Sequence, residues 1–305
     1  MARYVARRVG EAVFTLFVVS VAAFVLLKLM PFNLAAIMAG PRASPGTVAQ
    51  IAQGMGLDQP LPIQFLLWLH QLASGGAALA WQYAPPSLEL LFLGSALAAF
   101  CAFWIAYVQA KRPRTLFDRA ASLITFILFT LPSFWVGFVL IFVFGLQLLW
   151  LPAVGPNLDP SSQGFSNWIV EMILPVVTLA ITTIATWTTY FRGAIDEALR
   201  SDYIRTARAK GLPEDRVIVV HVLRNALLPA ITIAGLSLPS LFNNVIVIEW
   251  IFAMQGLGSA LVYALVAFNY GVAVDLVLVI GAVTICGSLV ADLLYAVADP
   301  RIKFV

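Results

Sequence analysis

Residues 120–149 read AASLITFILFTLPSFWVGFVLIFVFGLQLL, a run of thirty residues without one charged side chain. A helix needs about 20 apolar residues to cross the hydrocarbon core of a bilayer, so this run is long enough to span a membrane and to tilt. Pro132 lies inside the run and is tolerated in a membrane helix where neighbouring groups satisfy the freed carbonyl. The run therefore predicts a transmembrane helix.

The composition of the 305-residue chain points the same way. Hydrophobic residues make up 61% and charged residues 11%, and the mean hydropathy is +0.94. Soluble domains run near 45–50% apolar and about 25% charged, so a large soluble catalytic domain is excluded. The net charge of +3 comes from few residues, and no nucleic-acid partner is expected. Cys101 and Cys286 lie in apolar runs, which predicts small apolar side chains and neither a disulfide framework nor a metal site.

Six apolar stretches meet the length requirement for a transmembrane helix. They are residues 9–30, 88–110, 120–149, 171–191, 225–248 and 272–297. The predicted fold is an all-α membrane protein with six transmembrane helices. The predicted organisation is a cytoplasmic N-terminal segment (1–8), a transmembrane domain (9–298) with an external loop (31–87) and a loop between spans four and five (192–224), and a cytoplasmic C-terminal tail (299–305).

Lysine and arginine are distributed unevenly between the two sides of these spans. Sixteen of the 18 lie before span one, between spans two and three, between spans four and five, or after span six. Only Lys28 and Arg42 lie elsewhere. Because cytoplasmic loops of membrane proteins carry an excess of basic residues, both termini are predicted to be cytoplasmic.

The loop between spans four and five is the most charged part of the chain, with seven basic and five acidic residues. Its pattern predicts two short helices. Ser201 or Asp202 can cap the first, and Tyr203, Ile204 and Ala207 are apolar positions at helical spacing.

A predicted turn separates the two helices. Gly211 is expected to end the first, because glycine accepts the left-handed conformation that closes helices. Pro213 suits the start of the second, with Glu214 and Asp215 near its positive end. Such a helix pair is suited to docking into a groove on another protein. The alternative is an amphipathic hairpin that rests on anionic lipid headgroups.

The chain resembles permeases of a known transporter family in several segments. They are Asp202–Leu212, Leu223–Pro229, Tyr4–Arg8, Gly56–Phe65, Pro132–Gly137, Trp150–Pro152, Glu249–Gly258, Asp292–Tyr295 and Asp299–Ile302. Together they are similar, over nearly the whole chain, to permeases of the dipeptide/oligopeptide/nickel family of ABC importers. The departures after span one, at Pro31–Leu34, and around Gly75–Leu79 lie in the external loop. They bear on the substrate and its delivery protein.

The resemblance implies a type I ABC importer permease-like fold in which the loop at 192–224 couples transport to an ATPase. The coupling residues it implies are Asp202, Tyr203, Ile204, Arg205, Thr206, Ala207, Arg208, Ala209, Lys210, Gly211, Leu212 and Arg216. Tyr203, Ile204 and Ala207 would supply an apolar contact with the ATPase, inside a basic rim. ATP-driven closure of the ATPase would push this helix pair and rock the membrane helices between inward and outward openings.

The chain is expected to be a transport subunit without an ATPase site. It contains no Gly-Lys pair, so the glycine-rich loop and lysine that hold nucleotide phosphates are missing. The chain is expected to bind no cofactor. ATP and Mg are expected on two partner ATP-binding cassette subunits. The resemblance also implies a second homologous permease in a heterodimeric pore, an extracytoplasmic substrate-binding protein, surrounding membrane lipid, and a bacterial or archaeal cytoplasmic membrane.

The predicted function is to form half of the translocation pathway for di- and oligopeptides. Another solute of the same family, such as a nickel chelate or glutathione, is an open alternative. A secondary transporter would need a midplane ion site and inverted halves, and an intramembrane enzyme would need a Ser/His, His-rich or paired-Asp constellation. Neither pattern is visible in the sequence. The two histidines, His70 and His221, are predicted on opposite sides of the membrane and cannot share a metal site.

Six residues are candidates for the translocation pathway. They are Pro132, Phe134, Asn243, Asn244, Glu249 and Asp275. A charge near the bilayer centre costs roughly 2.5–3.5 kcal/mol on insertion scales, so Glu249 and Asp275 are expected to face a cavity or a partner. The alternative places both carboxylates at the outer interface, where this cost falls away.

Overall fold

The helical character of the chain is confirmed by its computed structural model. The structure describes residues 2–29, 34–40, 42–54, 56–76, 78–156, 164–223, 225–226, 233 and 235–298. These residues form helices joined by turns, and none of them lies in a β-strand. The chain is an all-α membrane protein, as its hydropathy predicts.

Four helices in the described ranges are long and apolar enough to cross a membrane. They are α1 (Ala2–Leu29), α6 (Ala84–Lys111), α9 (Phe165–Leu199) and α15 (Tyr270–Ala298). They correspond to predicted spans one, two, four and six. The fourth span continues past its predicted end, because α9 stays helical through the first part of the charged loop.

The predicted third span is not one continuous helix. It consists of α7 (Leu116–Thr130), α8 (Ser133–Leu140) and the π-helical η2 (Ile141–Gln147). The chain bends by 104° between the two arms. Pro132 has no N–H to donate and forces Leu131 into an extended conformation, with φ −82° and ψ 129°. The expectation that a helix continues through Pro132 is therefore wrong. The two arms form one transmembrane span if together they cross the bilayer, and a re-entrant loop if they do not.

The predicted fifth span lies partly outside the described residues. Its described part contains α13 (Leu238–Ile251), which has 14 residues and is shorter than the other candidates. A turn joins α13 to α14 (Leu257–Val266), which leads to α15. The six-span count therefore stays a prediction.

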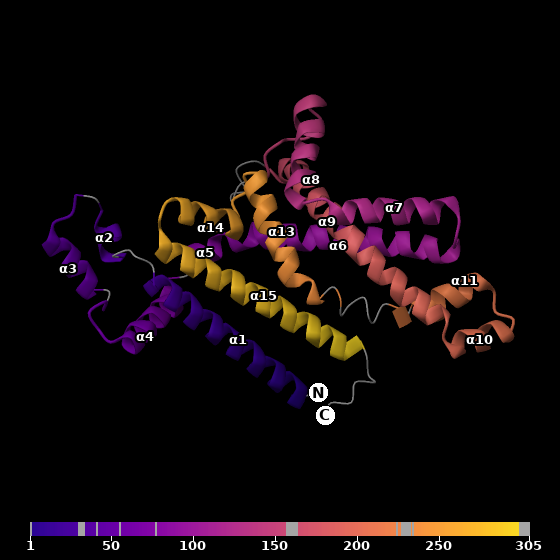
Figure 1. Cartoon of the computed structure of the whole chain (residues 1–305), viewed down its shortest axis with the longest axis horizontal. Helices are drawn as coiled ribbons and strands as arrows, with labels where there is room; N and C mark the ends of the chain where they lie inside the picture. The colour runs from indigo at the N-terminus through magenta and orange to yellow at the C-terminus, as the bar shows by residue number, and fades with distance from the viewer. Residues whose placement is uncertain are drawn as a thin grey trace.

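The predicted external loop contains short helices at one end of the molecule. They are α2 (Leu34–Ala39), α3 (Pro45–Gly54), α4 (Leu61–Gln71), η1 (Leu72–Gly76) and α5 (Ala78–Gln82). α4 rests on α1, where the rings of Phe65 and Phe24 meet edge to face at 5.3 Å and Lys28 donates to Gln64. Figure 1 shows α2, α3, α4 and α14 at one end, and α10 (Asp202–Ala209) and α11 (Glu214–Arg216) at the other.

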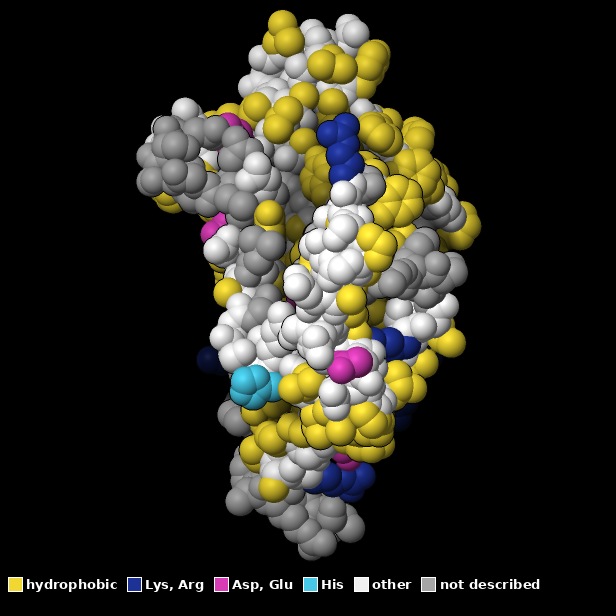
Figure 2. Space-filling model, turned by 90° about the vertical axis from the view of Figure 1, so that its left-hand side faces the viewer, with side chains coloured by type: hydrophobic (Ala, Val, Ile, Leu, Met, Phe, Trp, Pro, Cys, Tyr) yellow, Lys and Arg dark blue, Asp and Glu magenta, His cyan; other side chains and the backbone are white. Residues whose placement is uncertain are grey.

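Hydrophobic side chains also cover much of the surface. Figure 2 faces the end that carries the short helices, where yellow hydrophobic side chains spread widely and charged side chains stand apart from one another. This surface agrees with the charged share of 11%. Large apolar side chains are also exposed along the long helices, among them Phe14 of α1 and Phe92 and Phe100 of α6, as expected of helix faces that contact lipid.

A stripe of small residues on α6 lets α9 approach closely. A Cβ atom on Gly94 would lie 2.9 Å from the Cβ of Leu179, a distance that real side chains do not tolerate. Ala98, Ala102 and Ala106 follow at four-residue spacing, and each is fully buried. Membrane helices pack tightly through such small residues. The α6–α9 pair is the central unit of the fold, and α9 leads from it directly to α10.

Candidate functional site: a helical hairpin and a hydroxyl-lined cavity

The two short helices predicted after span four are present as a hairpin, defined here as residues 201–222. α10 ends at Ala209, and Gly211 follows with φ +77°. The N–H of Gly211 donates to the carbonyl of Arg208 at 2.9 Å, which closes the helix end. α11 begins at Glu214, directly after Pro213, and continues as the π-helical η4 (Val217–Val222). Helical segments and a turn at Gly211 thus lie where the sequence predicts a helix pair, and the coupling role of this pair stays a prediction.

The inner face of the hairpin is buried on the chain itself. Ile204 is fully buried and Ala207 is 7% exposed, and both belong to the same apolar cluster as Val217, Val222 and Ile195 of α9. This corrects the prediction that Ile204 and Ala207 contact an ATPase directly. Their helical spacing identified an apolar face, but that face packs inward.

The outer face of the hairpin is exposed and carries basic and acidic side chains. Tyr203 is 42% exposed. The other exposed residues of the predicted coupling set are Asp202, Arg205, Thr206, Arg208, Ala209, Lys210, Gly211 and Arg216, and Leu212 is half-buried. Of the three apolar residues predicted to meet a partner, only Tyr203 is available to one.

An ion pair within the hairpin joins its two helices. The guanidinium of Arg208 donates from Nε and Nη2 to the two carboxylate oxygens of Glu214, at 3.1 and 2.5 Å. These bonds raise the pKa of Arg208, so its charge is retained. A two-pronged contact of this kind fixes orientation as well as distance. Arg208 and Glu214 have opposite charges and lie on either side of Gly211 in the sequence, which is a signal for this ion pair. Helical periodicity alone does not show that they pair.

Further ion pairs connect the hairpin end to the long helices. Lys111, the last residue of α6, lies 2.6 Å from Asp215 of α11. Arg192 of α9 lies 3.0 Å from Asp118 of α7 and 3.2 Å from Asp196. One pair thus joins α6 to the hairpin, and the other joins α7 to α9.

The six pathway candidates are spread over three helical regions. Pro132 and Phe134 are exposed at the bend between α7 and α8. Asn243 is exposed and Asn244 half-buried on α13, and Asp275 is half-buried on α15. Helices α8 and α13 pack together, as do α13 and α15. None of the six is among the described residues that line the cavity below.

Glu249 is fully buried and is bonded to the start of α14. Its Oε2 accepts the backbone N–H groups of Gly258 at 2.8 Å and Ser259 at 3.1 Å. A Cβ atom on Gly256 would overlap this carboxyl group. The backbone N–H of Leu257, the residue before Gly258, donates to the hydroxyl of Ser87 on α6 at 2.8 Å. A carboxylate at a helix N-terminus is favourable, so Glu249 anchors α14 to α13.

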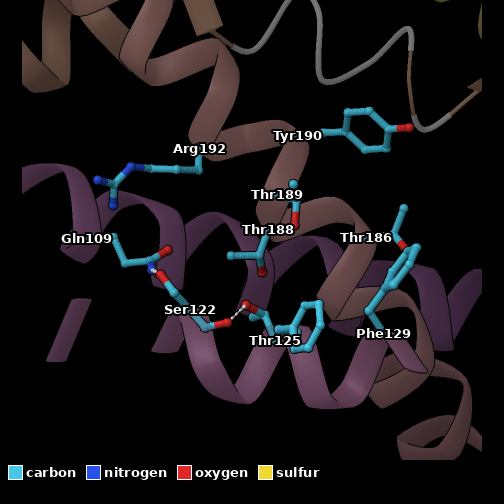
Figure 3. Close-up of a pocket in the computed structure, with 10 residues that line it drawn as sticks. Gln109, Ser122, Thr125, Phe129, Thr186, Thr188, Thr189, Tyr190 and Arg192 are labelled. Atoms are coloured by element: carbon cyan, nitrogen blue, oxygen red, sulfur yellow. Dashed lines mark hydrogen bonds between the residues drawn. The ribbon is translucent and has the colours of Figure 1, made fainter. Parts of the chain in front are cut away.

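A cavity of about 580 Å³ opens between α6, α7 and α9. It is lined by Gln109, Ser122, Thr125, Phe126, Phe129, Thr186, Thr188, Thr189, Tyr190 and Arg192. Figure 3 shows hydroxyl groups from α7 and α9 between the amide of Gln109 and the ring of Phe129. Sequence reasoning missed this site. The signal was the hydroxyl-rich run TTIATWTTY at residues 182–190 inside a predicted span.

Potential metal ligands do not gather anywhere in the described ranges: no group of three or more His, Cys, Asp or Glu side chains is found there. His70 lies in α4 and His221 in η4. These elements belong to opposite ends of the molecule (Figure 1).

Comparison with known sequences identifies the family. Residues 94–304 match the family described as binding-protein-dependent transport system inner membrane component, and residues 1–92 match its N-terminal companion family. The chain belongs to this transport family. The family resemblance inferred from the coupling segment and the other motifs is confirmed. This binding-protein-dependent permease is accordingly an integral membrane subunit of an importer.

Named relatives of this permease match it from end to end. The oligopeptide transport system permease protein AppB of Bacillus subtilis is 34% identical, with 100% of both chains covered. The di/tripeptide transport system permease protein DppB of Pseudomonas aeruginosa is 32% identical, with 99% of both chains covered. The probable peptide ABC transporter permease protein y4tP of Sinorhizobium fredii is also 32% identical over 100% of each chain.

A solved structure shares the fold. A chain from the crystal structure of an amino acid ABC transporter with histidines aligns with a TM-score of 0.55, covering 77% of this permease and 98% of that chain, at 16% identity. At this identity the likeness concerns the fold alone. It supports the helical permease architecture that the hydropathy predicted.

Proposed function

We propose that this permease forms half of the translocation pathway of an importer for short peptides, driven by ATP hydrolysis on two separate ATP-binding cassette subunits. The observation that carries the proposal is the hairpin. Its inner face is buried on α9 and its own second helix, whereas Tyr203 and the charged residues around it are exposed. A rigid projection with one exposed polar and aromatic face is suited to receive a push from a docked protein.

The coupling role is shared between two groups of hairpin residues. The exposed group meets the ATPase and consists of Asp202, Tyr203, Arg205, Thr206, Arg208, Ala209, Lys210 and Arg216. The other group, Ile204, Ala207, Gly211 and Leu212, positions the first. ATP and Mg are held by the ATPase subunits, and this chain binds no cofactor.

The peptide substrate is supported by the names of the relatives, which include oligopeptide and di/tripeptide permeases. The other half of the pathway is a second, homologous permease in a heterodimer, and an extracytoplasmic binding protein delivers the peptide. Five of the six pathway candidates, Pro132, Phe134, Asn243, Asn244 and Asp275, face the route of the peptide in this arrangement. The sixth, Glu249, is buried and anchors α14 instead.

The proposed topology places both termini and the hairpin in the cytoplasm of a bacterium or archaeon. The transmembrane domain is 9–298, with the external loop 31–87 and the coupling loop 192–224, between cytoplasmic segments 1–8 and 299–305. Figure 1 supports opposite locations for the two loops, because the short helices of one and the hairpin of the other lie at opposite ends.

The test is transport by the assembled complex in proteoliposomes with its binding protein. A tryptic peptide digest is added outside, ATP is enclosed, and the imported peptides are identified by mass spectrometry. We expect import that requires hydrolysable ATP and stops with a non-hydrolysable analogue. Accumulation of solute by this chain alone, without ATPase subunits, would overturn the proposal, as would a binding protein that retains only non-peptide solutes.

A further inference from the structure

The cavity between α7 and α9 contains two oxygen atoms that lack hydrogen-bond partners. Oε1 of Gln109 and Oγ1 of Thr188 are buried and make no hydrogen bond within the described part of the chain. Their side chains are 3% and 2% exposed. Leaving a buried polar atom unpaired costs about 1–3 kcal/mol, and native proteins pair the large majority of such atoms. Two unpaired oxygens in one cavity indicate that a ligand completes it.

Four other threonines of α9, Thr178, Thr182, Thr183 and Thr189, make a bond that Thr188 lacks. The hydroxyl of Thr183 donates to the carbonyl of Leu179 at 2.7 Å, and that of Thr189 to the carbonyl of Ala185 at 3.0 Å. A bond to the preceding turn is the usual way for a threonine to satisfy itself in a helix. Thr188 lies in the same helix without such a bond, so its hydroxyl is left available.

The side-chain amide of Gln109 is held by hydrogen bonds from its nitrogen, and its oxygen has no partner in the described part of the chain. Its Nε2 donates to the backbone carbonyl of Asp118 at 3.3 Å and to the hydroxyl of Ser122 at 3.1 Å. Rotating the amide by half a turn would set Oε1 against that carbonyl, and two acceptors cannot bond to each other. The orientation is therefore fixed, and Oε1 needs a donor from a ligand.

The rest of the lining consists of hydroxyl-bearing and aromatic side chains and one charged residue, Arg192. Phe126 and Phe129 are 67% and 65% exposed, so the rest of this chain covers little of their rings. Arg192 is the charged residue of the lining, and its guanidinium is paired with the carboxylates of Asp118 and Asp196. The volume of about 580 Å³ is within the range of small-molecule sites, roughly 300–1,000 Å³.

We propose that this cavity is a subsite for the backbone of the transported peptide, with Gln109 and Thr188 bonding to its amide groups. An amide N–H supplies the donor that Oε1 of Gln109 needs, and the Thr188 hydroxyl pairs with either an N–H or a carbonyl. The two phenylalanine rings pack against peptide side chains. Because backbone amides are common to all peptides, such a subsite holds peptides of different sequence. The inference rests on the proposed peptide-importer function and deepens it.

The experiment uses the assembled complex in proteoliposomes and, as probe, an equimolar mixture of alanine di-, tri-, tetra- and pentapeptides. Thr186→Cys is introduced in a chain carrying Cys101→Ser and Cys286→Ser, which removes both native thiols. The rate at which a water-soluble methanethiosulfonate modifies this cysteine reports access to the cavity. We expect the peptides to slow the modification at least fivefold. Adding Thr188→Val or Gln109→Met should reduce this protection to less than twofold.

The matched control is Thr183→Val, which removes a buried hydroxyl of the same helix that is bonded to the backbone and lies outside the lining. It should retain full protection. Loss of protection with Thr183→Val as well, or no protection in a complex that imports the alanine peptides, overturns the subsite. Failure of Thr188→Val alone to assemble with the second permease also overturns it, because the cavity would then be a packing surface. A parent complex that imports none of these peptides fails at the level of the proposed function, and the subsite falls with it.

Discussion

Nζ of Lys111, at the end of α6, lies 2.6 Å from Oδ1 of Asp215, in the first turn of α11. The hairpin is also continuous with α9 through its first helix, and α6 packs on α9 along the small-residue stripe. The hairpin is therefore attached to both members of the central helix pair. A displacement of the hairpin reaches α9 through the chain and α6 through this ion pair.

Replacing the lysine of this ion pair by an acid should uncouple transport from ATP hydrolysis. Both side chains are well exposed, at 41% and 69%, so Lys111→Asp should leave folding almost unchanged. We expect the number of peptides imported per ATP hydrolysed to fall at least threefold in Lys111→Asp. It should recover in the double variant with Asp215→Lys, where the attraction is restored with opposite polarity. Uptake and phosphate release are measured in the same proteoliposomes.

The control for this experiment is Arg7→Glu, which reverses one member of another exposed ion pair, with Glu11 on α1. It should leave the ratio of peptide to ATP unchanged. If Lys111→Asp also leaves the ratio unchanged, the contact between α6 and α11 transmits no force.

Tyr203 and Ile204 should give opposite phenotypes although they are adjacent. Ile204 is fully buried, so Ile204→Ala should destabilise the hairpin by about 2–5 kcal/mol and speed amide hydrogen exchange across residues 201–222. Tyr203 is exposed, so Tyr203→Ala should leave exchange unchanged and reduce co-purification of the ATPase. Retained co-purification in Tyr203→Ala, at normal expression, contradicts its assignment as the apolar contact.

The effect of a substitution at Gly211 should depend only on how well the new residue adopts the left-handed backbone conformation. Its φ is +77°, and no atom lies within 4 Å of the position a Cβ would take, so crowding contributes nothing. Gly211→Val should cost about 1–2 kcal/mol through the left-handed conformation and lower peptide-stimulated ATPase activity. Gly211→Asn, which tolerates this conformation better, serves as the matched control and should lie close to the parent. Equal activity in both variants argues that the turn geometry has no role in coupling.

Glu249→Gln should weaken the anchor of α14. The substitution keeps the shape of the side chain but replaces the carboxylate oxygen that accepts the N–H groups of Gly258 and Ser259 by an uncharged amide. The expected loss is about 1–3 kcal/mol, seen as faster thermal inactivation of the purified complex. Asn243→Ala, an exposed change on the same helix, should not affect inactivation. Unchanged thermal stability together with an altered half-saturating peptide concentration would show instead that Glu249 meets the substrate.

The local features of this protein could be predicted from its sequence. The long apolar runs predicted α1, α6, α9 and α15, because hydropathy over about 20 residues is a property of the run itself. The turn at Gly211 and the start after Pro213 were predicted because backbone preferences act within a few residues. The family was recognised for the same reason, since its motifs are contiguous.

Tertiary structure decided the features that depend on which surfaces meet. A helical period places Ile204 and Ala207 on one face, but only packing against Val217 and the end of α9 shows that this face turns inward. The bend at Pro132 depended on whether neighbouring helices would support a straight one. Lys111 and Asp215 form an ion pair although they are about 100 positions apart in the sequence. Gln109 and Thr188, about 80 positions apart, line the same cavity. Periodicity carries no information on such contacts, because burial and hydrogen bonding are set by the packing of distant helices.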